Sequence, residues 1–233
     1  MKKHISVAAL TLRLTWVRAL GLFAAVGVLQ WLLIPGRDTV DSFQDYIYQA
    51  ANIGLAGFLI LCLLLMLALC KSGKICTDYT WRRLRIPEGW ATVISGLVLS
   101  GWIVLYGAFQ LAVCLGLYCS FNEFWHYGRE YLMLSAFRAE YLHLLLPVAE
   151  PWALVRNVVF VLIVGNLLAV AAGMQRSGIP GSWAYPYLAW LISKLSSGGI
   201  ATRTDDIMVM VFWIVLVILA WFVTWRGRKH EAS

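Results

Sequence analysis

Two Glu-x-x-His pairs stand near the middle of the sequence, Glu123 with His126 and Glu140 with His143. On a helix this spacing places a carboxylate beside an imidazole, an arrangement that di-metal carboxylate proteins use to hold metal ions. Those proteins take the two pairs from separate helices and add further inward glutamates. Here the pairs begin 17 residues apart, about 25 Å along one helix, unless the chain folds back near Gly128. Both histidines fit interfacial positions better, and we expect no metal site.

Signatures of other chemistry are missing from the sequence. It contains no G-x-x-x-x-G-K-[ST], no G-x-S-x-G and no H-E-x-x-H motif, so we expect neither ATP binding through a P-loop nor hydrolase activity. Its five cysteines form no C-x-x-C pair and no Cys/His metal spacing. We therefore expect no enzyme activity and no cofactor bound by this chain.

The composition is that of a membrane protein, with 61% hydrophobic and 13% charged residues and a mean hydropathy of +0.75. An apolar helix of about 20 residues crosses the hydrocarbon layer. The sequence predicts an all-α integral membrane protein, a single transmembrane domain over residues 1–233 with about six transmembrane helices. The expected spans are residues 19–35, 50–70, 91–121, 157–175, 182–193 and 207–225.

The distribution of charge favours six crossings over five. The fifth expected span is short, contains Pro186 and ends at Lys194. With six crossings and both termini cytoplasmic, 13 of the 19 basic residues lie inside and nine of the twelve acidic residues lie outside. Basic residues cross membranes reluctantly, so this is the favoured orientation. The net charge of +7 then indicates topology and attraction to an anionic inner leaflet, with no nucleic-acid partner. A plasma membrane is the expected location.

Two surface helices are expected beside the spans. Arg13 and Arg18 interrupt the first apolar run and no cleavage site follows, so the start of the chain is interpreted as a retained N-terminal interfacial helix rather than a signal peptide. Its apolar face comprises Ile5, Ala8, Ala9, Leu12 and Trp16. The span of residues 19–35 is short, and its helix can extend back through Arg18 if that side chain reaches the membrane surface. On the outer side, residues 121–152 are too apolar for a free loop. An outer interfacial helix is predicted there from the spacing of Leu134, Phe137, Tyr141 and Leu144 or Leu145, ended by Pro147 and Pro151.

The first cytoplasmic connection contains the stretch TDYTWRRLRIPEGW, residues 77–90. Residues 80–86 suffice for about two helical turns, and Pro87 with Glu88 suits the first turn of the next span. A short basic helix is therefore expected on the cytoplasmic face. By composition alone it fits a basic anchor on anionic lipid as well as a docking element. Its central residues are Trp81, Arg82, Arg83, Leu84 and Arg85.

Two stretches resemble ABC-2-type permease subunits of ABC transporters, in particular those of Gram-positive bacteria. YTWRRLRIPEGW and the span after it resemble the region around that family's second and third helices, with matches at Tyr79, Thr80, Arg82, Arg83, Leu84 and Gln110. SAFRAEYLHLLLPVAEPWALVRN resembles the outer helix and the start of the fourth span, with matches at Phe137, Leu142, His143, Leu145, Leu146, Pro147, Arg156 and Asn157. The resemblance covers roughly residues 75 to 175.

The resemblance implies an exporter half with six helices, in which the basic stretch is a coupling helix that docks on a separate ABC ATPase subunit. That ATPase would bind ATP and Mg, and a second permease subunit would complete the transporter. Gln110 and Asn166 would bond between helices or line a translocation route. Lys194, in a fifth span shorter than the family's, would reach the membrane surface or attract an anionic substrate. The alternative is a non-transporting membrane scaffold or sensor subunit, and an enzyme ranks third.

Overall fold

The computed structural model describes residues 2–32, 43–70, 87–125 and 151–176, and also residues 207, 211, 214, 215 and 218. Helix is the regular structure in all of these ranges. The long helices are α1 (Lys2–Leu32), α2 (Phe43–Cys70), α4 (Glu88–Trp125) and α7 (Pro151–Arg176). The described part of the chain is thus all-helical, as the sequence predicts.

Four of these helices are long and apolar enough to cross a membrane. Their apolar stretches are His4–Leu32, Gln49–Cys70, Gly89–Leu117 and Leu154–Gln175, which correspond to the first four expected spans. The fifth expected span, residues 182–193, lies outside the described residues. Five residues of the sixth are described, and all are helical and exposed: Ile207, Val211, Ile214, Val215 and Ile218. Four helices of this length and composition are consistent with a multi-pass membrane protein, and the count of six stays a prediction.

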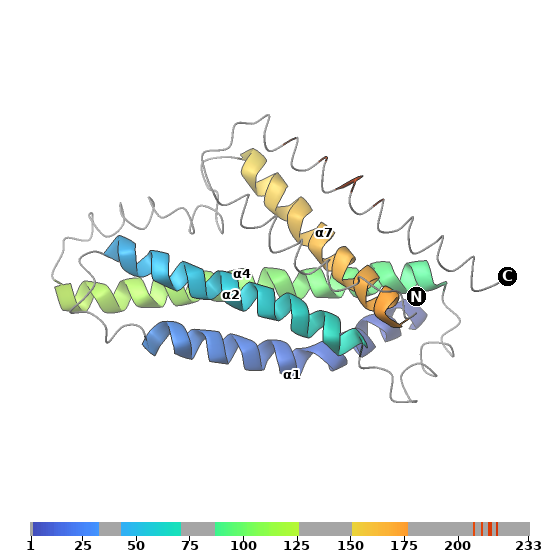
Figure 1. Cartoon of the computed structure of the whole chain (residues 1–233), viewed down its shortest axis with the longest axis horizontal. Coiled ribbons are helices and arrows are strands. Elements are labelled where there is room, and N and C mark those ends of the chain that lie inside the picture. Colours follow the sequence, from blue (N-terminus) through green and yellow to red (C-terminus); the bar gives the residue numbers. More distant parts are fainter. Residues whose placement is uncertain are drawn as a thin grey trace.

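The four long helices alternate in direction, with α1, α2 and α4 lying roughly along one axis and α7 crossing them at an angle (Figure 1). α1 and α4 run parallel, and α2 and α7 run the opposite way. The ring of His4 in α1 lies 6.3 Å from the ring of Trp90 in α4, and Cys70 Sγ of α2 lies 4.0 Å from the Ala172 carbonyl oxygen of α7. One end of the bundle therefore gathers the start of α1, the end of α2, the start of α4 and the end of α7. We call it the N-terminal end.

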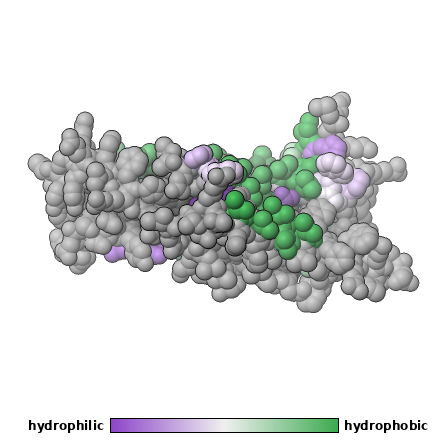
Figure 2. Space-filling model, turned by 90° about the horizontal axis from the view of Figure 1, so that it is seen from above, coloured by the Kyte–Doolittle hydropathy of each residue, from purple (hydrophilic) through white to green (hydrophobic). Residues whose placement is uncertain are grey.

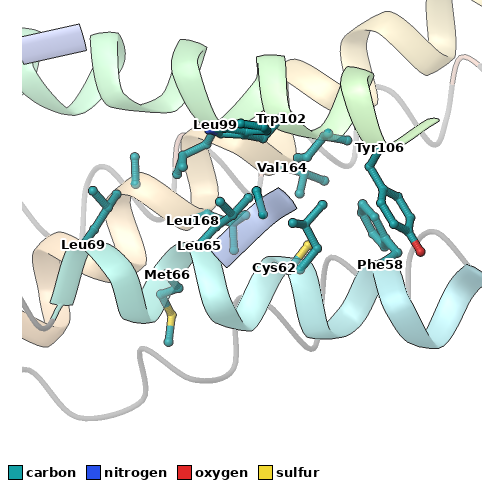
Figure 3. Packing of buried hydrophobic residues seen from close by; sticks show 14 of the residues in the cluster. Phe58, Cys62, Leu65, Met66, Leu69, Leu99, Trp102, Tyr106, Val164 and Leu168 are labelled. Carbon is teal, nitrogen blue, oxygen red and sulfur yellow. The ribbon is translucent and has the colours of Figure 1, made fainter. Parts of the chain in front are cut away.

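The core lies where α2, α4 and α7 face one another, and Figure 3 shows Leu65 and Cys62 of α2 pointing toward Trp102 of α4. From α1, Phe23 adds its ring, stacked on Phe109 with centroids 5.3 Å apart. Lipid tails are as apolar as leucine, so helices in a membrane associate through close packing and polar contacts. The surface of the bundle is also apolar. Figure 2 shows a band of apolar side chains on one face, with hydrophilic residues beside its ends.

α1 differs from the expectation of a surface helix followed by a separate span. It runs without a break over 31 residues, about 46 Å. The apolar residues Ile5, Leu12 and Trp16 are exposed, whereas Thr11 and Thr15 face the bundle and are fully buried. Threonine tolerates this position because its hydroxyl bonds to a carbonyl one turn back in the same helix. The outward apolar face agrees with contact to lipid, but it belongs to one continuous helix.

α4 begins where the sequence predicts. The first helical residue is Glu88, and the Ala91 N–H donates to the carbonyl oxygen of Pro87 at 3.2 Å. Proline is harmless at a helix start because its missing N–H would have no partner within the helix. The helix then extends to Trp125, past the expected end at residue 121, so that Glu123 lies in its last turn.

Candidate functional site

The structure describes some of the predicted site residues, and others lie outside the described ranges. Gln110 lies in α4 and Asn166 in α7. Of the metal-type pairs, Glu123 lies in the last turn of α4. The described ranges contain no group of three or more His, Cys, Asp or Glu side chains placed to hold a metal ion. Outside the described residues are Trp81, Arg82, Arg83, Leu84, Arg85, His126, Glu140, His143, Lys194 and the expected outer helix.

Gln110 takes part in a junction of three helices, here called the glutamine junction. The Gln30 side-chain amide of α1 donates to Gln110 Oε1 at 2.8 Å and to the Ala50 carbonyl oxygen of α2 at 3.0 Å. Both glutamines are fully buried. In an apolar environment such bonds between helices contribute about 1 kcal/mol each. The junction ties α1, α2 and α4 together near the end of the bundle opposite the N-terminal end.

Asn166 is placed differently. Its side-chain amide donates to the Leu162 carbonyl oxygen, one turn back in α7, at 2.8 Å. Its carbonyl side lies against Gly96 of α4, where a Cβ would meet Asn166 Oδ1 at 2.7 Å. Asn166 therefore bonds within its own helix and packs on the neighbouring one in the space that a glycine leaves.

Small residues bring α4 and α7 together at one crossing. A Cβ at Gly165 would lie 2.5 Å from the Gly96 carbonyl oxygen and 2.7 Å from the Ser100 nitrogen, so the two backbones nearly touch. Ser100 Oγ lies 3.0 Å from the carbonyl oxygens of both Gly96 and Val161. Glycine and serine spaced four apart are a common interface in membrane helices because they admit this approach. We call this set the glycine crossing: Gly96, Ser100 and Gly165.

Polar side chains also join the parallel helices α1 and α4 near the N-terminal end. The hydroxyl oxygens of Thr11 and Ser95 lie 3.3 Å apart. The Trp102 indole N–H donates to Thr15 Oγ1 at 2.8 Å, and the Thr15 hydroxyl in turn donates to the Thr11 carbonyl oxygen at 2.9 Å. All four side chains are buried. These contacts set the register of α1 against α4.

Sequence reasoning missed the contribution of α1 to these contacts. It singled out Gln110 and Asn166 but not Gln30, Thr11 or Thr15, because the first helix was divided into a surface part and a span. A signal was present in the sequence. Val7, Thr11, Thr15 and Ala19 are spaced four apart, which places them on one helical face, and all four are fully buried.

Charge differs between the two ends of the described helices. Lys2 and Lys3 begin α1 and Arg176 ends α7, all at the N-terminal end. Asp45 lies in the first turn of α2 and Glu123 in the last turn of α4, both at the other end. Two residues of the described helices depart from this pattern: Glu88 begins α4 at the N-terminal end, and Arg156 lies near the start of α7 at the other end. The connection that holds the three arginines of residues 82–85 joins Cys70 to Pro87, both of which lie at the N-terminal end. Among the basic residues expected on the cytoplasmic side, Lys2, Lys3 and Arg176 thus lie at one end of the bundle, and the connection of residues 71–86 begins and ends there.

The polar groups described here hold helices together, and their chemistry is that of neutral hydrogen bonds between amides, hydroxyls and an indole. They suit a membrane bundle with a defined packing rather than proton transfer or nucleophilic attack. Comparison of the chain with protein-family models, with curated proteins and with solved structures gave no match in any of the three.

Proposed function

We propose that this chain is the membrane-spanning permease subunit of an ABC transporter, an exporter energised by a separate ATPase chain. The observation that carries the proposal is the position of the basic connection, residues 71–86. It links the end of α2 to the start of α4, and these two helices pack on each other. The connection lies at the end of the bundle that also holds the basic start of α1 and the basic end of α7. The resemblance of residues 75–175 to ABC-2-type permeases adds to it.

A coupling helix works only if its displacement reaches the spans. α2 and α4 are joined directly, because the Tyr106 hydroxyl donates to the Gly54 carbonyl oxygen at 2.7 Å. α4 is held to α7 at the glycine crossing and to α1 through Thr15 and Trp102. A force applied between Cys70 and Pro87 therefore acts on helices that are bonded to each other and to α1 and α7.

The interior of the bundle also suits one half of a transporter. It is filled by aromatic and aliphatic side chains, among them Phe23, Phe58 and Tyr106. In the proposed transporter the substrate therefore passes along the interface between this chain and a second permease subunit. In this assembly two ATPase chains bind ATP and Mg in the cytoplasm, and both termini of the permease lie on that side of a bacterial plasma membrane. The positive-inside rule supports the orientation, because the N-terminal end carries the basic residues.

Co-purification of the ATPase tests the proposal. The variant Arg82→Glu with Arg83→Glu replaces attraction by repulsion at the proposed docking site and should release the ATPase while the permease still inserts. Arg226→Glu with Arg228→Glu is the matched control, since it makes the same charge reversal in the C-terminal tail, and it should retain the ATPase. Equal recovery from wild type and the first variant would refute the coupling helix. A wild type that recovers no Walker-motif ATPase would favour the scaffold or sensor alternative.

A further inference from the structure

Arg13 occupies an unusual place for a charged side chain. It lies within the apolar stretch His4–Leu32 and is exposed. Its neighbours on the outward face of α1 are apolar and also exposed, with Trp16 at 48%, Val17 at 61% and Leu20 at 48%. A charge on the outer face of a spanning helix is costly unless it reaches water, a headgroup or an opposite charge. The surroundings of Arg13 therefore call for a partner outside α1.

The depth of Arg13 along the bundle indicates which partner it can reach. His4 contacts Trp90 at the N-terminal end, and Trp31 lies 27 residues beyond His4, about 40 Å along α1 and close to the full thickness of a bilayer with its headgroups. Arg13 lies nine residues from His4, about 13 Å. Helical side chains point back toward the N-terminus, and arginine extends its charge along an apolar stem. The guanidinium thus reaches the headgroup layer at the N-terminal end.

We propose that Arg13 binds the phosphate of an anionic phospholipid in the leaflet at the N-terminal end of the bundle, and that Trp16 packs beside an acyl chain of the same lipid. A guanidinium matches a phosphate with two parallel hydrogen bonds. Trp16 lies three residues from Arg13 and is its neighbour on the helix surface, about 18 Å from His4 along α1 and so at the level of the acyl chains. Lys2 and Lys3, in the first turn of α1, raise the positive potential over the headgroup.

Charge complementarity favours a lipid over a protein carboxylate. Acidic residues in the described ranges are Asp45, Glu88 and Glu123. Asp45 and Glu123 lie at the opposite end of the bundle, and Glu88 begins α4 beside the level of His4. The leaflet on the basic side of a membrane supplies negative charge at the required depth. This inference is independent of the proposed transport function.

Lipid binding to the purified protein tests the inference. In detergent, the wild type is titrated with phosphatidylglycerol or with zwitterionic phosphatidylcholine, and bound lipid is counted by native mass spectrometry. Arg13→Gln should weaken phosphatidylglycerol binding about fivefold, the effect of one basic residue near a membrane surface, and leave phosphatidylcholine binding unchanged. Arg13→Lys keeps the charge and should retain most of the affinity. Arg176→Gln, with the same loss of charge at the same end of the bundle, should bind as the wild type does.

Four results would overturn the inference. Equal phosphatidylglycerol binding by wild type and Arg13→Gln would show that Arg13 is not the site, and an equal loss in Arg176→Gln would show a general effect of net charge. Loss of a protein dimer in Arg13→Gln, with lipid binding intact, would assign Arg13 to a second copy of the chain. A rise in melting temperature with inorganic phosphate as large as that with phosphatidylglycerol would indicate an anion site without lipid specificity.

Discussion

Gln30 and Gln110 meet across two parallel helices, with the amide nitrogen of Gln30 2.8 Å from the side-chain oxygen of Gln110. The same nitrogen donates to the backbone of α2 at Ala50. Because a buried amide in an apolar interior must find partners, the contact fixes the relative height of α1, α2 and α4. A slip of one helix by a single residue would break it.

The first prediction follows from this contact. Gln30→Met and Gln110→Met keep the approximate size of the side chain. Gln110→Met removes the bond between the two side chains and should lower the free energy of unfolding by about 1 kcal/mol, whereas Gln30→Met also removes the bond to the Ala50 carbonyl oxygen and should lower it by about 2 kcal/mol. The double variant should cost less than the sum of the two, because the second change removes no further shared bond. Unfolding in mixed micelles of rising SDS content measures all four proteins. Asn52→Leu is a control at an exposed position of α2, with an expected change in the free energy of unfolding below about 0.5 kcal/mol. A double variant whose loss of stability equals the sum of the two single losses would contradict the coupling.

A second prediction concerns the glycine crossing. Gly165→Ala should separate α4 from α7, because the new methyl group would meet the backbone at Gly96 and Ser100, which cannot rotate away. We expect a loss of about 1 to 3 kcal/mol. Gly173→Ala in the same helix is the matched control, since no atom lies within 4 Å of its Cβ position, and alanine there should be neutral or stabilise by up to about 1 kcal/mol. The same unfolding measurement compares the two, and similar stabilities would show that the helices are not in close contact.

Sequence reasoning succeeded where a span has clear limits. Residues 50–70 were expected to cross the membrane, and the apolar stretch found is Gln49–Cys70, with a mean hydropathy of 2.9. Polar residues precede it and Lys71 follows it, so composition alone sets its limits. The same reasoning located the start of α4, because Pro87 and Glu88 are typical of a first turn.

It failed where the outcome depends on which helices meet. The sequence predicts an N-terminal surface helix separate from the first span, with the helix of that span extended back through Arg18, yet α1 continues without a break through Arg13 as well. Arg13 is exposed and Arg18 half-buried, and long basic side chains on an outer face can extend toward the membrane surface without ending a helix. Similarly, the composition of α4 points to Gln110 as a polar residue in a span, but its partner Gln30 is 80 residues away. Gln30 becomes the partner of Gln110 only because α1 packs on α4.

A third prediction tests that packing near the N-terminal end. Thr15→Val preserves the shape of the side chain and removes the acceptor of the Trp102 indole N–H, so it should cost about 1 kcal/mol. In a Trp102→Phe background the same change should cost clearly less, because the bond is already lost. Unfolding of the two single variants and the double variant in SDS mixed micelles supplies the comparison. A cost for Thr15→Val that is the same in both backgrounds would mean that the hydroxyl acts through its bonds to the Thr11 and Leu12 carbonyl oxygens of its own helix.

The last prediction concerns orientation, and cysteine labelling in a background without the five native cysteines measures it. α2 ends and α4 begins at the N-terminal end of the bundle, so a cysteine at Ser72 should lie on the same side of the membrane as the start of α1. A cysteine at Ser42, just before α2, should lie on the other side. Because basic residues gather at the N-terminal end, we expect Ser72→Cys to be shielded from an impermeant maleimide in intact cells and Ser42→Cys to react. Reaction of Ser72→Cys in intact cells would show that the protein has the opposite orientation. With six crossings Ser233→Cys is shielded as well, whereas its labelling in intact cells would leave an odd number of crossings and remove either the short fifth span or the sixth.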